Sequence, residues 1–88
     1  MRRLTFTLYS RSYCHLCDDM LNALLALQTD TLRFDVAVVD VDADPALVAR
    51  FDELVPVLFG ASASGDGPEL CHYFLDQPAV SRYIATAV

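Results

Sequence analysis

The stretch "LYSRSYCHLCDD", from Leu8 to Asp19, places two cysteines, Cys14 and Cys17, two residues apart. They follow an apolar run and precede a run with helical periodicity. Cysteines at this spacing are found in redox pairs, in one half of a metal site, and as buried thiols that happen to lie close together. The local structure on either side of the pair is the first means of choosing among these.

The residues before the pair predict a strand, and those after it predict a helix. Leucine and phenylalanine alternate with threonine and tyrosine over Leu4–Tyr9, so we expect a strand there, followed by the short loop "SRSY". Beyond Cys14 the apolar residues recur every three or four positions, as in an amphipathic helix, at Leu16, Met20, Ala23, Leu24 and Leu27. This helix should end near Gln28–Asp30.

The middle of the chain predicts a second strand and a second helix. The segment "RFDVAVVDVD" is rich in valine and has apolar residues at both odd and even positions. A strand that is covered on both faces, as in a parallel sheet, has this composition. Asp44 and Pro45 then predict a helix cap and a first helical residue. This short helix should run to about Phe51–Asp52.

The last third predicts a hairpin and a final helix. Val57–Phe59 follows Pro56 and reads as a strand, the loop "GASASGDGP" is rich in turn residues, and "ELCHYFL" reads as an antiparallel partner. Asp76 can cap a last helix over Ala79–Ala87, with Pro78 in its first turn. The order is β-α-β-α-β-β-α, which predicts one α/β domain over residues 1–88 with a four-stranded mixed sheet flanked by helices.

Composition and charge exclude several classes of function. The 88 residues are 55% hydrophobic and carry a formal net charge of −6, with a sequence pI of about 4.4. An acidic chain repels nucleic acid, whose binding depends on Lys and Arg. No apolar run approaches the roughly 20 residues that cross a bilayer, and "MRRLTFTLYS" does not resemble a signal peptide. We therefore expect a cytoplasmic protein that binds neither nucleic acid nor membranes. We also expect a monomer.

The position of Cys14 at the start of a helix favours its reactive thiolate. Unpaired backbone N–H groups and the helix dipole stabilise an anion there. Arg11 lies within one loop length, and His15 contributes positive charge when it is protonated. Such surroundings lower thiol pKa values from about 8.5 into a range of roughly 3.5–7.5. Asp18 and Asp19 oppose this unless they point to solvent.

Cys17 follows one helical turn later, on the side that carries Met20, Leu21 and Leu24, which predicts that it is the more buried thiol. Close cysteines in a reducing cytosol are more often catalytic or metal-binding than structural. A zinc site remains an alternative, because Cys71, His72 and His15 are further ligand candidates. Two inert core cysteines are the other alternative. Taken singly, Cys71 is predicted to be inert, His15 to face solvent and His72 to be structural.

Three segments together resemble the glutaredoxin-like branch of the thioredoxin superfamily. These are "YSRSYCHLC", "VVDVDADPALVARF" and "LVPVL", which occur in the family's order and extend the resemblance over nearly the whole chain. The resemblance implies a thioredoxin-like fold of the glutaredoxin type. It also implies that Cys14 is the nucleophilic cysteine and Cys17 the resolving one.

The same resemblance assigns four substrate-binding or glutathione-binding residues. Arg11 matches the basic residue that helps to hold a glutathione carboxylate, and Tyr13 lies beside the nucleophile. Val55 matches the residue whose backbone pairs with the bound peptide or glutathione, and Pro56 matches the family's cis-proline. Two features depart from the family: the central dipeptide is His15-Leu16 rather than Pro-Tyr, and "YFLDQPAV" lacks the family's Gly-Gly pair before the last helix.

The expected function is therefore that of a small thiol–disulfide oxidoreductase. Its partner would be a disulfide-containing protein or a glutathione mixed disulfide, and glutathione would be a co-substrate rather than a tightly bound cofactor. We expect no metal. Two alternatives stay open: a thioredoxin-fold adaptor module with a vestigial dithiol, and a glutaredoxin-like protein that binds a metal or an iron–sulfur cluster through Cys14.

Overall fold

The computed structural model describes residues 4–60 and 67–87. Along the chain it contains β1 (Leu4–Ser10), α1 (His15–Leu25), β2 (Phe34–Asp40), a 3₁₀ turn η1 (Val41–Ala43), α2 (Pro45–Phe51), β3 (Val57–Phe59), β4 (Glu69–His72) and α3 (Gln77–Ala87). The predicted β-α-β-α-β-β-α order is confirmed, with η1 as an addition. Most of the loop predicted over residues 60–68 and the first three residues lie outside the described ranges.

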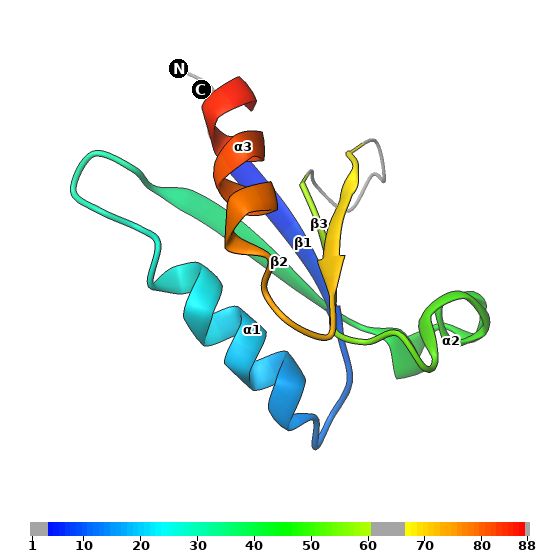
Figure 1. The fold of residues 1–88 in the computed structure, drawn as a ribbon. Coiled ribbons are helices and arrows are strands. Elements are labelled where there is room, and N and C mark those ends of the chain that lie inside the picture. Colours follow the sequence, from blue (N-terminus) through cyan, green and yellow to red (C-terminus); the bar gives the residue numbers. More distant parts are fainter. Residues whose placement is uncertain (1–3, 61–66, 88) are drawn as a thin grey trace.

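The four strands form one mixed sheet in the order β2-β1-β3-β4. β1 pairs with β2 in parallel, and β3 pairs with both β1 and β4 in antiparallel. This is the thioredoxin-like α/β fold that the sequence predicts. Figure 1 shows α3 crossing in front of β1, while α2 lies apart at the right-hand end of the molecule.

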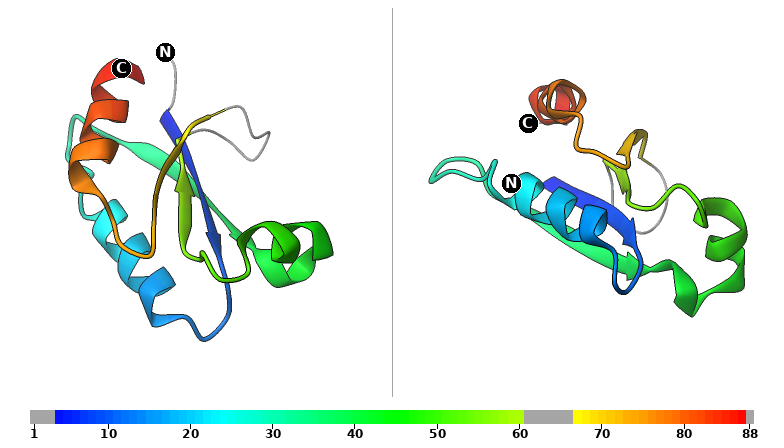
Figure 2. Two further views of the ribbon diagram at one scale, coloured as in Figure 1. Left: turned by 45° about the vertical axis from the view of Figure 1, so that its right-hand side comes forward. Right: turned by 60° about the horizontal axis from the view of Figure 1, so that its bottom comes forward.

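The alternation of side chains along β1 divides the core into two clusters, one on each face of the sheet. Phe6 and Leu8 point to the face that is covered by α1 and α3, where they pack with Met20, Leu24, Phe34, Leu58 and Val80. Tyr9 has the opposite parity and packs with Val41, Phe51 and Val57 on the α2 side. The two views in Figure 2 show this division, with α2 away from α1 and α3.

One strand prediction needs correction. The sequence predicts a second strand that is covered on both faces, but Val38 is 52% exposed, so this coverage is incomplete. β2 is also an edge strand, which the sequence does not predict. Apolar residues at both odd and even positions indicate that both faces of the strand have neighbours over part of its length. They carry no information on whether the strand has a partner along both edges.

Two element ends also differ from the predictions. α1 stops at Leu25 rather than near Gln28–Asp30, and Leu27 continues to contact the core from the turn that follows. β4 stops at His72 because Tyr73 has a positive φ of 65°, a conformation that a ladder residue does not adopt. "YFL" therefore forms the turn into α3 instead of extending the strand.

The two predicted helix caps are confirmed. Asp44 accepts a hydrogen bond from the Ala46 N–H at 2.9 Å, and Asp76 accepts one from the Ala79 N–H at 3.1 Å. Each carboxylate satisfies a backbone donor that the first turn of the helix leaves unpaired. None of the helices in the described ranges has the length and apolar character that crossing a membrane requires.

Candidate active site

Cys14 and Cys17 form a disulfide at the N-terminus of α1, with their Cα atoms 5.2 Å apart. Cys14 is the N-cap residue and has an extended backbone, with φ −112° and ψ 104°. Its Sγ atom accepts a hydrogen bond from the Cys17 backbone N–H at 3.1 Å. The first sulfur is therefore placed where the unpaired N–H groups of the helix start converge.

The two sulfurs differ in their access to solvent. Cys14 is half-buried, whereas Cys17 is only 3% exposed. Cys17 belongs to the buried stripe of α1, together with Met20 and Leu24. Asp18 is exposed, as expected for a carboxylate that does not approach the sulfurs. The prediction that Cys17 is the more buried thiol is confirmed.

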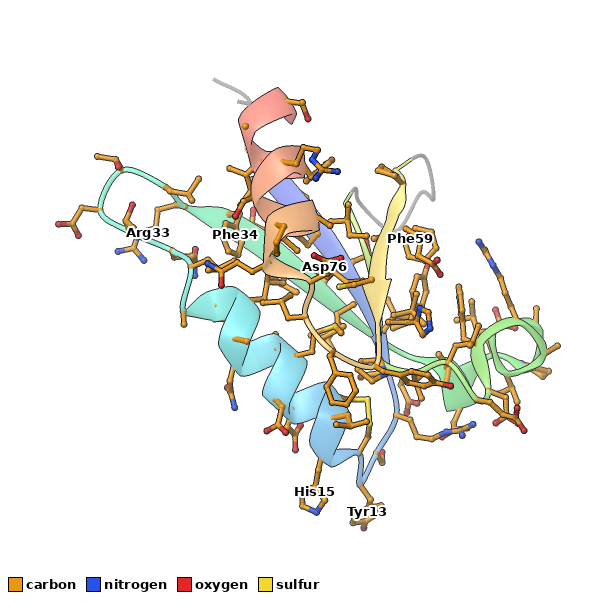
Figure 3. All side chains as sticks on the ribbon, in the orientation of Figure 1. Tyr13, His15, Arg33, Phe34, Phe59 and Asp76 are labelled. Atoms are coloured by element: carbon orange, nitrogen blue, oxygen red, sulfur yellow. A yellow bond between two sulfur atoms is a disulfide. The ribbon has the colours of Figure 1, made fainter. Side chains whose placement is uncertain are left out.

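The loop before Cys14 turns the chain from β1 into α1 at Tyr13. Tyr13 has a positive φ of 59° and a fully exposed side chain. A non-glycine residue in this left-handed region costs roughly 1–2 kcal/mol, so the tight turn is maintained by the structure around it. Figure 3 shows Tyr13 and His15 pointing away from the body of the protein at this end of α1. His15 faces solvent, as predicted.

Arg11, predicted to bind a glutathione carboxylate, is engaged with two carboxylates of the protein itself. Its Nε and Nη2 atoms donate to Asp42 at 3.1 and 2.9 Å, and Nη2 also lies 2.9 Å from Asp52 Oδ1. These hydrogen bonds, first with Asp42 and then with Asp52, raise the pKa of the Arg11 guanidinium above its ordinary value. The positive charge that was expected beside Cys14 is therefore largely neutralised.

Val55 and Pro56 lie between α2 and β3, and the peptide bond that joins them is cis. Pro56 is buried, and its carbonyl accepts a hydrogen bond from the Tyr73 N–H at 2.9 Å. The Val55 N–H donates to the Phe51 carbonyl at 3.2 Å. The Val55 backbone is predicted to pair with a bound substrate, but its N–H already has this partner within the protein.

Sheet pairing brings the Pro56 segment to the same end of the sheet as the dithiol loop. Tyr9, at the end of β1, is the register partner of Val57, at the start of β3. Val57 is in turn the partner of His72, at the end of β4. Antiparallel pairing therefore places the exit of β1, the entry of β3 and the exit of β4 at one sheet end. Arg11, Tyr13, Val55 and Pro56 follow or precede these strand ends, as predicted.

The turn that follows β4 contributes two residues that sequence reasoning missed. The Tyr73 hydroxyl donates to the Glu53 carbonyl at 2.6 Å, which connects this turn to the segment before Pro56. Phe74 is 70% exposed, and its N–H donates to the His72 carbonyl at 2.7 Å. The available signal was the absence of the family's Gly-Gly pair in "YFLDQPAV", which carries two aromatic residues before the last helix.

The remaining cysteine and histidine lie in β4. Cys71 is half-buried, and burial raises the pKa of its thiol, with the charges of Asp76 and Glu69 acting in the same direction and a backbone hydrogen bond from Asp76 opposing them. His72 is exposed and packs against the Tyr73 ring. Within residues 4–60 and 67–87, no three His, Cys, Asp or Glu side chains lie close enough together to hold a metal ion.

Two solved structures share about a third of their sequence with this chain. Protein Ne2328 from Nitrosomonas europaea, determined by solution NMR, is 34% identical over 94% of this chain and 93% of its own, with a TM-score of 0.79. Protein XcR50 from X. campestris, determined by X-ray crystallography, is 34% identical over 94% of this chain and 99% of its own, with a TM-score of 0.63.

A more distant structure confirms the fold alone. Thioredoxin 1 from Thermosipho africanus TCF52B matches 94% of this chain and 97% of its own with a TM-score of 0.59, at 17% identity. Among curated proteins, none matches the chain significantly. The family described as Glutaredoxin-like domain (DUF836) matches residues 5–85. The chain therefore belongs to this glutaredoxin-like family of the thioredoxin superfamily.

Proposed function

We propose that this protein is a thiol–disulfide oxidoreductase in which Cys14 is the nucleophile and Cys17 the resolving thiol. The observation that carries the proposal is the asymmetry of the pair. The Cys14 sulfur accepts the Cys17 N–H and is the more exposed of the two, whereas Cys17 is 3% exposed and one helical turn away. A reaction on an external disulfide needs such an accessible thiolate together with a sheltered partner.

The reductive half-reaction follows from this geometry. The Cys14 thiolate attacks one sulfur of the substrate disulfide, the substrate S–S bond breaks, and the first substrate thiolate leaves and takes up a proton. Cys17 then loses its proton and attacks Cys14 Sγ, which breaks the mixed disulfide and releases the second substrate thiol. The substrate gains two electrons and two protons, and the protein becomes the Cys14–Cys17 disulfide.

Regeneration requires a thiol reductant. Two equivalents of a monothiol such as glutathione, or one protein dithiol, return the two electrons by the same exchange in the opposite direction. The more accessible sulfur, that of Cys14, is again the point of attack, because Cys17 is buried.

The test is disulfide trapping with matched cysteine variants. Cys17→Ser should accumulate a stable mixed disulfide with insulin or with a glutathionylated peptide, because the resolving thiol is missing, while Cys14→Ser should form none. Cys71→Ser is the control and should turn over like the unmodified protein. If Cys17→Ser traps neither substrate, or if Cys14→Ser traps as well as Cys17→Ser, the assignment of roles is wrong.

An adaptor with a vestigial dithiol is the second candidate, and the exposed rings of Tyr13 and Phe74 favour it, because exposed aromatic side chains are common at binding surfaces. The same variants separate the two functions. An adaptor would bind its partner equally well with or without Cys14 and would form no trapped species. An oxidoreductase loses its captured partners on Cys14→Ser.

A further inference from the structure

Arg11 has almost no hydrogen-bonding capacity left for a ligand. A guanidinium carries five N–H donors. Two of them meet Asp42 in a bidentate pair, a third meets Asp52 Oδ1, and Nη1 donates to the Asp52 backbone carbonyl at 3.3 Å. Only one Nη1 donor is left over. The planar fork suits one carboxylate at a time, and here Asp42 already occupies it.

The contacts of Arg11 connect three segments that surround the dithiol. Arg11 itself begins the loop that leads to Cys14. Asp42 lies in η1, directly after β2, and Asp52 is the C-cap of α2, three residues before Val55. The guanidinium thus holds the dithiol loop against the chain segment that ends in Pro56. A substitution that releases Arg11 frees the loop as well as the charge.

No other arginine among the described residues replaces the positive charge that Arg11 loses. Arg11, Asp42 and Asp52 together carry a net charge of −1. In the described ranges the other arginines lie elsewhere: Figure 3 places Arg33 at the far end of α1 from Tyr13, Arg50 stacks on the rings of Phe51 and Phe59, and Arg82 lies on α3 beside Pro68 and Glu69. The chain contains no lysine.

Exposed apolar side chains gather on the segments at this sheet end instead. Seven large hydrophobic side chains are exposed among the described residues, and five of them belong to the dithiol loop with the first turn of α1, to the segment before Val55, or to the turn after β4: Tyr13, Leu16, Leu54, Tyr73 and Phe74. Glutathione, with two carboxylates and one ammonium group, is less suited to such surroundings than a neutral or basic polypeptide carrying apolar side chains.

We propose that Arg11 is a positioning residue for the dithiol loop rather than a carboxylate ligand, and that the site consequently prefers protein disulfides with neutral or basic flanks over glutathione mixed disulfides. This inference rests on the proposed oxidoreductase function. It reverses the role that the family resemblance implies for Arg11. It also identifies Asp42 and Asp52 as the residues that keep the Arg11 guanidinium from pairing with an anionic substrate.

The experiment compares kcat and KM for two substrates: insulin, and a neutral peptide carrying a glutathione mixed disulfide. Arg11→Met should lower kcat on both substrates by a similar factor, since it releases the loop, and should leave the KM for the glutathionylated peptide unchanged. The double variant Asp42→Asn with Asp52→Asn should lower kcat in the same way. Because it also frees the guanidinium, it should lower the KM for the glutathionylated peptide by up to about fivefold, the scale of one exposed ion pair.

Two controls match the charge changes. Arg33→Met removes a positive charge far from the site, and Asp30→Asn with Glu69→Gln removes two exposed carboxylates at the other end of the fold. Neither should change the KM ratio of the two substrates. Arg11→Lys keeps the charge but not the bidentate fork, so it should not restore kcat. The double asparagine variant retains Arg11 with near-isosteric side chains, so the proposal is tested even if Arg11→Met does not fold.

The opposite result is well defined. If Arg11→Met raises the KM for the glutathionylated peptide alone, and the double asparagine variant does not lower it, Arg11 is a carboxylate ligand and the inference is wrong. The oxidoreductase function survives that outcome, because both substrates still react. If neither substrate is trapped by Cys17→Ser, the function itself fails before Arg11 is tested.

Discussion

In the reduced protein, Cys14 should react with a small neutral disulfide faster than a free cysteine at pH 6, and this advantage should vanish in alkaline solution. The reason is the position of its sulfur, which receives the Cys17 backbone N–H at 3.1 Å at the N-terminus of α1. Both features stabilise a thiolate and leave the neutral thiol almost unaffected.

The size of the effect follows from these two contributions. A hydrogen bond to a charged group contributes about 1.5–3 kcal/mol, and a helix N-terminus adds about 0.3–1 kcal/mol for an anion. Their sum raises the ratio of thiolate to thiol by about 20-fold to several hundredfold, since about 1.4 kcal/mol is a factor of ten. The nucleophilicity of the thiolate falls as roughly the square root of that ratio.

The net gain therefore depends on pH. At pH 6 a free cysteine is almost entirely thiol, so the larger thiolate fraction outweighs the lower nucleophilicity and leaves a gain of about two- to eightfold, the lower end allowing for partial burial of Cys14. Near pH 8.5 a free cysteine is about half thiolate. Little thiolate is left to gain there, and the less nucleophilic Cys14 should become the slower of the two.

The assay is stopped-flow reaction with 4,4′-dipyridyl disulfide over this pH range. It uses the single-thiol variant Cys17→Ser with Cys71→Ser, compared with a cysteine-containing peptide. Cys17→Ser keeps the backbone N–H that stabilises the thiolate, so the gain at pH 6 should persist, and adding His15→Gln should not remove it. A rate at pH 6 no higher than that of the peptide would refute the reasoning, as would loss of the gain with His15.

Three further predictions concern the packing and titration of α3 and β4. Gly60→Ala should lower the free energy of unfolding, measured by urea denaturation, by about 1–3 kcal/mol, because the added Cβ would lie 2.6 Å from Tyr83 Cε1. In a Tyr83→Leu background the same substitution should cost clearly less, and an equal cost would exclude this clash. Asp76→Ala should lower the free energy of unfolding by about 1 kcal/mol, because it removes the carboxylate that accepts the Ala79 N–H. Asp76→Asn should lower it much less, and equal losses for the two variants would show that the cap is not the cause. Burial raises the pKa values of the Cys71 thiol and the Tyr83 hydroxyl above their ordinary values. In alkaline solution the unfolded chain therefore binds fewer protons than the folded one, and the free energy of unfolding should fall as pH rises. In Cys71→Ser the decline should begin at higher pH, and an unchanged profile would contradict the assignment.

The features that the sequence predicts correctly have signals confined to a few neighbouring residues. The caps Asp44 and Asp76 lie two and three residues before the N–H groups from which they accept hydrogen bonds. The burial of Cys17 follows from its helical period with Met20 and Leu24. Such features can be predicted from neighbouring residues, because the helix geometry that produces them does not depend on the rest of the chain.

The features that the sequence does not predict depend on contacts between distant segments. Arg11 reaches Asp42 and Asp52, which lie 31 and 41 positions further along the chain. In an acidic chain, many carboxylates are equally plausible partners until the topology is known. The exposure of Val38 has a related origin, because strand order decides which strand lies at the edge and a strand's own composition reports mainly on its faces.

The proposed division of roles between the two cysteines depends on the phase of the motif as much as on its spacing. Cys14 lies outside the first turn with an extended backbone, so its sulfur faces the N–H groups of the helix start. Cys17 lies on the buried stripe. Because successive helix residues are rotated by about 100°, moving the pair forward by one position would put the second sulfur at the exposed position of Asp18. The same C-x-x-C spacing would then give two accessible thiols and no sheltered resolving cysteine. This is why the motif is specific only when the residues that follow it fix which side of the helix faces the sheet.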